Sequence, residues 1–222
     1  MTRDQVRERI RSIGVIPAIR VATAAEALFA VEAVASGGIP IVEITMTVQG
    51  ALEVIADLAA SNAELIVGAG TVLDADTAKA CIDAGAHFIT SPALKEPVVR
   101  AAHQRDVVVI PGAMTPTEIS AAWDMGVDFI KVFPCSSLGG PSYIRALRRP
   151  FPELPIIAAG GVNQQSAAEF IRYGASALGI GTGLISAGAL SHHETKRIRE
   201  LARRYVAIVQ RTREEIGADS RL

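Results

Sequence analysis

The 222-residue sequence predicts a single (β/α)8 barrel, the TIM-barrel fold of the α/β class, with an extra helix at its N-terminus. Eight short runs rich in Val and Ile begin every 20–27 residues, which is close to the length of one strand and one crossover helix. Hydrophobic residues make up 50% of the chain and aromatic residues only 5%, so Ala, Val, Ile and Leu must build the core. Side chains of this kind suit a parallel sheet covered by helices.

The eight apolar runs are interpreted as the barrel strands. They are Val15–Arg20, Pro40–Thr45, Leu65–Gly70, His87–Ser91, Val107–Gly112, Asp128–Phe133, Pro155–Gly160 and Ser176–Gly181. Strands that alternate with helices form a parallel sheet, and eight evenly repeated units favour a closed barrel over an open doubly wound sheet. No linker or change of composition divides the chain, so we expect one domain over residues 1–222.

Capping signals mark the helices between these runs. Residues 1–13 form the predicted N-terminal helix, and Thr23 with Glu26 makes a capping box for the next helix. Thr115 is the predicted cap of a further helix, with Pro116 at its first position and Glu118 at its third. Glycines that suit left-handed helix ends precede several strands, at positions 37–38, 85, 126 and 174. A last amphipathic helix with a frayed tail is expected over residues 191–222.

Charge and composition argue against several classes of protein. The net charge is −1, and the basic stretch Lys196–Arg213 is broken by Glu and apolar residues, so a solvated helix face is favoured over a nucleic-acid site. No apolar run approaches the ~20 residues of a membrane span, and the N-terminus lacks a signal-peptide core. Cys81 and Cys135 lie far apart, so a reduced, cytoplasmic protein is expected.

Metal and nucleotide motifs are also missing from the sequence. The four histidines show no ligand spacing, which argues against a metal-dependent enzyme. Neither a P-loop nor a dinucleotide fingerprint is present. Cys135 is interpreted as a packing residue rather than a nucleophile.

Lys131 is the strongest candidate for chemistry. Alternation in the run 129–133 places Phe129, Lys131 and Phe133 on one face, which would point into the barrel. Burial destabilises the ammonium form and leaves a fraction of free amine, the nucleophile that Schiff-base enzymes use. The alternative is a structural ion pair inside the barrel.

Glu43 is the predicted partner of Lys131. It lies on the second predicted strand and Lys131 on the sixth, which stand opposite one another in an eight-stranded barrel. A carboxylate there could move protons for imine formation and for carbon–carbon cleavage, or could only neutralise the lysine. Thr45 lies on the same face as Glu43 and is expected to contact substrate.

Two side chains at strand ends are candidates for substrate binding. Arg20 closes the first strand and could grip a carboxylate or phosphate, with a plain surface arginine as an equal alternative. Thr71 follows the third strand and could place a hydroxyl beside a keto acid.

The loops after the seventh and eighth strands contain Gly160-Gly161 and Gly181-Thr182. These positions often bind phosphate in such barrels through backbone N–H groups, so a phosphorylated substrate is favoured over two ordinary turns.

Motifs along nearly the whole chain resemble the 2-dehydro-3-deoxy-phosphogluconate (KDPG) / 4-hydroxy-2-oxoglutarate (KHG) aldolase family. The matching stretches are VEITMT, VGAGTVL, TSPAL, IPGAMTPTE and IKVFP. The resemblance implies a metal-independent, homotrimeric class I aldolase that splits these keto acids into pyruvate and glyceraldehyde 3-phosphate or glyoxylate. It also implies that Lys131 forms the Schiff base, without any other cofactor, and that Glu43 shuttles protons. Thr71 and Pro92 would contact the pyruvyl part, and Phe133 would pack against the imine.

Two positions depart from common patterns of the family. Thr47 stands where some members carry a substrate-binding arginine, and other members instead carry an arginine where Arg20 stands. Ala159 replaces a hydroxyl-bearing residue that would face the aldehyde half of the substrate. The aldehyde accepted and its stereochemistry therefore stay open, and a 2-dehydro-3-deoxy-6-phosphogalactonate aldolase is an alternative.

Two further hypotheses use the same barrel. A sugar-phosphate isomerase or epimerase would need paired inward carboxylates or metal-ligating histidines, and the sequence offers one inward Glu. A catalytically idle barrel that serves as an oligomeric scaffold is the third hypothesis. The set of Lys131, Glu43 and Thr71 favours working chemistry over an idle scaffold.

Overall fold

Nine parallel strands form one barrel sheet in the computed structural model, which describes residues 1–219. The strands are β1 (Val15–Ile19), β2 (Ile41–Thr45), β3 (Ile66–Gly70), β4 (Phe88–Thr90), β5 (Val108–Ile110), β6 (Gly112–Ala113), β7 (Ile130–Val132), β8 (Ile156–Ala159) and β9 (Ala177–Ile180). Their order in the sheet is β5-β4-β3-β2-β1-β9-β8-β7-β6. The two ends of this order, β5 and β6, are consecutive in the chain, so the sheet closes on itself.

Pro111 explains why nine strands stand where the sequence predicts eight. It separates β5 from β6 and has no N–H to donate to the ladder. Its carbonyl still accepts a hydrogen bond from the backbone N–H of Lys131 at 2.9 Å. Strand β5 pairs with β4, and β6 pairs with β7. The predicted barrel is therefore confirmed, with its fifth strand in two pieces.

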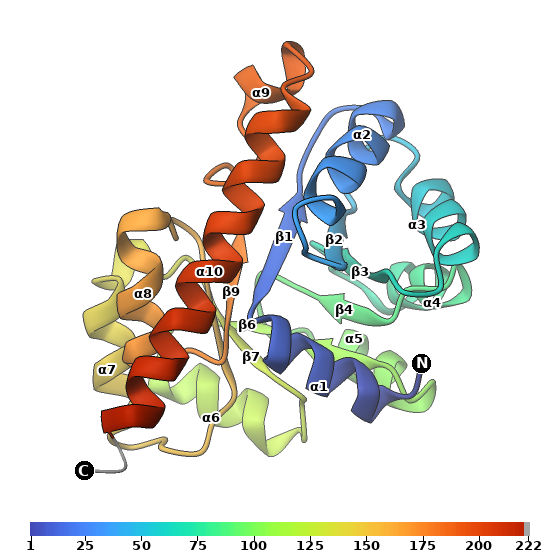
Figure 1. Cartoon of the computed structure of the whole chain (residues 1–222). Helices are drawn as coiled ribbons and strands as arrows, with labels where there is room; N and C mark the ends of the chain where they lie inside the picture. The colour runs from blue at the N-terminus through green and yellow to red at the C-terminus, as the bar shows by residue number, and fades with distance from the viewer. Residues whose placement is uncertain (220–222) are drawn as a thin grey trace.

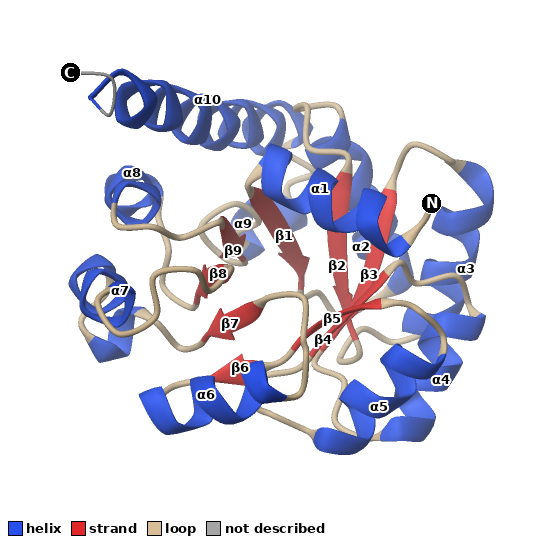
Figure 2. Ribbon diagram, turned by 90° about the horizontal axis from the view of Figure 1, so that it is seen from below, coloured by secondary structure: helices blue, strands red, loops and turns tan. Residues whose placement is uncertain are grey.

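Helices surround these strands (Figures 1 and 2). They are α1 (Arg3–Ile13), α2 (Ala24–Ala35), α3 (Ala51–Ser61), α4 (Ala75–Asp83), α5 (Glu96–Gln104), α6 (Pro116–Asp124), η1 (Ser136–Leu138), α7 (Pro141–Arg148), α8 (Gln164–Arg172), α9 (Ala187–Ser191) and α10 (Thr195–Asp219). Both predicted capping boxes are present, at Thr23 with Glu26 and at Thr115 with Glu118.

The barrel interior is tightly packed because glycines make room for large side chains. A Cβ built on Gly68 of β3 would lie 2.2 Å from the ring of Phe88 on β4. Phe88 is fully buried and occupies the space beside Gly68. Strand residues that face the helices, such as Val42 and Ile44, are also fully buried. The apolar core thus lies on both sides of the sheet, as a parallel sheet requires.

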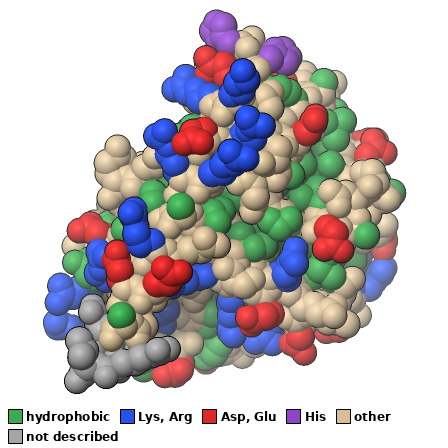
Figure 3. All heavy atoms as spheres, in the orientation of Figure 1, with side chains coloured by type: hydrophobic (Ala, Val, Ile, Leu, Met, Phe, Trp, Pro, Cys, Tyr) green, Lys and Arg blue, Asp and Glu red, His purple; other side chains and the backbone are tan. Residues whose placement is uncertain are grey.

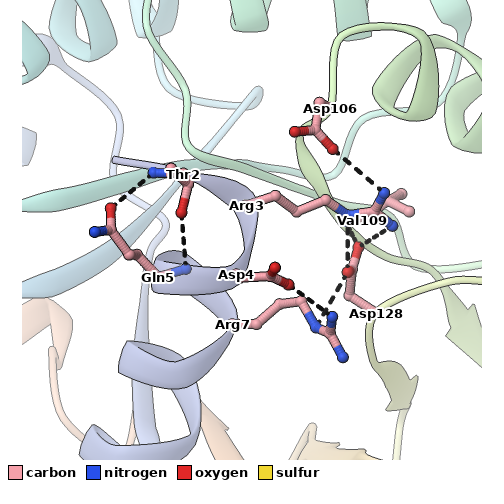
Figure 4. Close-up of polar contacts among 8 residues, drawn as sticks. All are labelled: Thr2, Arg3, Asp4, Gln5, Arg7, Asp106, Val109 and Asp128. Atoms are coloured by element: carbon pink, nitrogen blue, oxygen red, sulfur yellow. Dashed lines mark hydrogen bonds and ion pairs between the residues drawn. The ribbon is translucent and has the colours of Figure 1, made fainter.

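The N-terminal helix α1 covers the amino-terminal end of the barrel (Figure 2). Its Val6 and Ile10 are buried. A buried carboxylate holds the helix in place: Asp128, just before β7, accepts hydrogen bonds from the guanidinium of Arg3 at 2.9 and 3.0 Å and from the backbone N–H of Val109 at 2.9 Å (Figure 4). Arg7 approaches the same carboxylate at 3.4 Å.

The last helix, predicted from residue 191, is present as α10, and a short helix α9 that the sequence did not predict precedes it. Helix α9 ends at Ser191, and α10 then packs against α2 and α8. Ile198, Tyr205 and Val209 of α10 are fully buried. Basic side chains gather on the solvent side of this helix in Figure 3, which fits the predicted solvated face. The last three residues of the predicted tail, 220–222, lie outside the described residues.

Candidate active site

Lys131 and Glu43 meet inside the barrel. The Nζ atom of Lys131 on β7 lies 3.3 Å from Oε2 and 3.5 Å from Oε1 of Glu43 on β2. Their side chains are 13% and 5% exposed, so this ion pair is largely shielded from water. The predicted inward direction of both side chains and their contact across the barrel are confirmed.

A missing side chain on the neighbouring strand creates the space for the carboxylate. A Cβ built on Gly70 of β3 would lie 2.2 Å from Oε1 of Glu43. Strands β2 and β3 pair in register, with Thr45 opposite Gly70. Gly70 therefore lets the carboxylate lie flat against the β3 backbone, within reach of Lys131.

Phe133 lies beside the amine and shares an apolar cavity with Pro92. The Nζ atom of Lys131 lies 5.6 Å from the centre of the Phe133 ring. Phe133 and Pro92 line a cavity of about 260 Å³ together with Gly112 and Met114. A Cβ on Gly112 would lie 2.1 Å from the carbonyl oxygen of Pro92, so only glycine fits between them.

Arg20, directly after β1, and Thr71, directly after β3, are in contact. The Nη2 atom of Arg20 donates to the hydroxyl of Thr71 at 3.2 Å. Thr71, directly after Gly70, has a φ of +60°, in the left-handed region that few non-glycine residues adopt. Because its oxygen accepts from Arg20, the Thr71 hydroxyl keeps its own proton for a ligand.

Thr45 lies deeper than the predicted contact with substrate suggests. It is fully buried, and its hydroxyl donates to the carbonyl of Ile19 at 3.0 Å. The same oxygen lies 2.8 Å from the hydroxyl of Thr47. Thr45 therefore supports the exposed Thr47 through this contact. Residues two apart in a strand face the same side, so their spacing was the sequence signal that places Thr47 near Thr45 at this rim.

The predicted phosphate-binding residues divide into two places. Thr182 shares a cavity of about 500 Å³ with Arg20 and Thr47. Gly181 has open space beside it, since a Cβ there would approach protein no closer than 4.0 Å. Gly160 and Gly161 lie instead against the loop after β7.

That loop contributes a residue that sequence reasoning missed. A Cβ on Gly161 would lie 1.9 Å from the hydroxyl of Ser136, and one on Gly160 would lie 2.8 Å from Pro134. Both glycines have a φ of +83°. The Ser136-Ser137 pair in the loop after the lysine strand was the signal that could have identified this contact.

Cys135 is a packing residue, as predicted. Its side chain is fully buried, and burial raises the pKa of its thiol to about 12. A thiol of this kind stays protonated near neutral pH and is a poor nucleophile.

Metal and membrane features are absent from the described chain. Residues 1–219 contain no group of three or more His, Cys, Asp or Glu side chains placed to hold a metal ion. None of the helices in this range is long and apolar enough to cross a membrane.

Comparison with known proteins identifies the family of this chain. The family model described as KDPG and KHG aldolase matches residues 6–201. The KHG/KDPG aldolase of Escherichia coli (strain K12) is 32% identical over 192 residues, which cover 86% of this chain and 90% of the relative.

Solved structures agree with that assignment. A KDPG aldolase from Legionella pneumophila, with pyruvate captured as a covalent carbinolamine, has a TM-score of 0.83 and 26% identity over 89% of this chain and 96% of its own. A structure described as native KDPGal has a TM-score of 0.83 and 30% identity over 90% of this chain and 96% of its own. The chain therefore belongs to the KDPG and KHG aldolase family of carbon–carbon lyases.

Proposed function

We propose that this chain is a class I aldolase in which Lys131 forms the imine and Glu43 moves the protons. The substrate is a 2-keto-3-deoxy sugar acid phosphate of the KDPG type, 4-hydroxy-2-oxoglutarate, or both, and the products are pyruvate and an aldehyde. The observation that carries the proposal is the shielded contact of 3.3 Å between the amine and the carboxylate.

The contact supports a simple sequence of proton transfers. Glu43 takes a proton from the Lys131 ammonium, and the free amine attacks the C2 ketone to give a carbinolamine. Loss of the C2 oxygen as water, with a proton returned by Glu43, leaves a protonated imine. Glu43 then takes the proton of the C4 hydroxyl as the C3–C4 bond breaks, and the imine receives the electron pair. Protonation of the resulting enamine at C3 and addition of water release pyruvate and the amine.

Surrounding groups are suited to hold the keto acid for these steps. Thr71 offers a hydroxyl proton to a carbonyl or carboxylate oxygen, and Arg20 beside it offers a guanidinium to an anionic group. Phe133 and Pro92 provide an apolar wall for the methylene part of the pyruvyl group. The imine itself is the electron sink, so the reaction needs no other cofactor.

The aldehyde half is assigned to the loops after β8 and β9. Thr182 and Gly181 line or border the space next to Arg20, and Gly160 with Gly161 continues the rim toward β7. We assign a phosphate to these residues. A 2-dehydro-3-deoxy-6-phosphogalactonate aldolase is the alternative for the same site. A homotrimer in the cytoplasm, without nucleic-acid or membrane partners, completes the proposal and rests on the family resemblance.

Trapping the imine tests the proposal directly. Incubation with pyruvate and sodium borohydride should add one stable adduct to Lys131, located by peptide mass spectrometry. Lys131→Ala should abolish both the adduct and the release of pyruvate. Lys79→Ala removes an exposed lysine paired with Asp76 and is the matched control, which should behave like the wild type. Glu43→Gln should keep a slow adduct and lower kcat by about 10²–10⁴-fold.

The same measurements separate the competing hypotheses. Pyruvate release should be compared for KDPG, its C4 epimer and 4-hydroxy-2-oxoglutarate. Isomerisation or epimerisation of a sugar phosphate without any adduct would support the isomerase instead. An intact, folded protein with neither adduct nor turnover would support the scaffold.

A further inference from the structure

We propose that Thr47 determines specificity in this aldolase by accepting a hydrogen bond from a hydroxyl group in the aldehyde half of the substrate. The inference rests on the proposed function and adds a substrate class to it. It follows from the count of hydroxyl protons on the rim of the barrel.

The direction of the hydrogen bonds at this rim is fixed. The Oγ1 atom of Thr45 lies 3.0 Å from the carbonyl oxygen of Ile19, and a carbonyl can only accept, so Thr45 donates its one hydroxyl proton there. The Oγ1 atoms of Thr45 and Thr47 lie 2.8 Å apart. Since the proton of Thr45 is already used, Thr47 must donate its proton to Thr45.

Thr47 therefore presents only lone pairs to a ligand. Its side chain is exposed and lines the cavity of about 500 Å³ that also contains Arg20 and Thr182. An oxygen with no free proton repels the oxygens of a phosphate or carboxylate and attracts a donor. A hydroxyl is the donor that an aldol substrate carries at this end.

The rest of the cavity lining offers a place for a single anionic group. Arg20 is the one cation among the residues of the described chain that line it. The carboxylate of Glu26 is occupied by the backbone N–H groups of Ala22 and Thr23 at 3.0 and 3.1 Å. The hydroxyl of Ser191 donates to the carbonyl of Gly188 at 3.1 Å, and Val21, Ile185 and Leu190 are apolar. The cavity thus suits a substrate end with one anionic group and a hydroxyl within reach of Thr47.

The experiment compares two aldehydes in the direction of aldol addition to pyruvate. D-Glyceraldehyde 3-phosphate carries a hydroxyl next to its carbonyl, and 3-oxopropyl phosphate lacks that hydroxyl but keeps the same charge. The wild type should prefer the hydroxylated aldehyde in kcat/KM by about tenfold, the equivalent of one hydrogen bond. Thr47→Val should reduce this ratio to near one, and Thr47→Ser should restore it.

A nearby control and the imine trap make the outcomes distinct. Gln49→Ala changes an exposed side chain on the same loop outside the cavity lining and should keep the wild-type ratio. A borohydride adduct on the wild type, together with the same ratio in Thr47→Val, would overturn the inference and leave the aldolase intact. A wild type without any adduct would overturn the proposed function and this inference with it.

Discussion

The carboxylate of Glu43 lies against the backbone of Gly70, so closely that a Cβ on Gly70 would stand 2.2 Å from its Oε1 atom. Glu43 is 4% exposed, and its one side-chain partner among the described residues is Lys131. The position of this ion pair therefore depends on a residue that makes no hydrogen bond to either member. This position requires glycine for its small size, since the Gly70 backbone does not adopt a left-handed conformation.

Gly70→Ala should therefore lower activity without affecting the chemistry of either partner. The added methyl must displace the Glu43 carboxylate, and a shift of about 1 Å can cost about 10²-fold in rate. We expect kcat to fall by about this factor while the variant stays folded by circular dichroism. Gly188→Ala is the matched control because no protein atom lies within 4 Å of the new methyl. Equal kcat values for the two variants would contradict this account of Gly70.

Sequence reasoning could find the centre of the site because its rules are local and periodic. Alternation along two strands gives the inward direction of Lys131 and Glu43, and barrel symmetry places the second and sixth predicted strands opposite one another. The packing of Gly70 under Glu43 could not be predicted, because it depends on the register between β2 and β3.

Contacts made by loops and by the N-terminal helix also could not be predicted from the sequence. The pairing of Arg20 with Thr71 needs the positive φ of Thr71, which no pattern predicts for a threonine. Thr45 faces inward as expected. Its hydroxyl donates to the carbonyl of Ile19 on the neighbouring strand, and a contact between strands depends on their register. The pairing of Arg3 with Asp128 joins residues 125 positions apart, and charge alone does not identify such a partner.

That ion pair should contribute to stability more than the surface pairs do. The Asp128 side chain is 2% exposed and accepts from Arg3 and from the Val109 N–H, so its removal leaves a buried donor unpaired. Asp128→Ala should lower the free energy of unfolding by about 2–3 kcal/mol in urea titrations. Asp4→Ala breaks an exposed pair with Arg7 and should change it by less than about 0.5 kcal/mol. Similar losses in both variants would contradict the anchoring role of Asp128 (Figure 4).

Thr90 offers a substitution that should stabilise the protein. Its side chain is 1% exposed, and its hydroxyl has no hydrogen-bond partner within residues 1–219. A buried hydroxyl without a partner is destabilising, and valine has nearly the same shape without the polar atom. Thr90→Val should raise the free energy of unfolding by about 1 kcal/mol, measured by urea denaturation. A loss of stability would show that the hydroxyl is satisfied in solution.

Cys81 should make the protein less stable at alkaline pH. Burial, with a smaller contribution from the charge of Asp74, raises the pKa of its thiol from 9.0 to about 11. Between these values the unfolded chain loses the thiol proton and the folded chain keeps it, so stability falls as the pH rises. The difference of two pKa units corresponds to about 2–3 kcal/mol. The free energy of unfolding, plotted against pH, should therefore fall by about this amount for the wild type relative to Cys81→Ala between pH 8 and pH 11. The other titrating groups are common to both proteins. Parallel curves across that range would mean that the thiol ionises equally in the folded and unfolded chains.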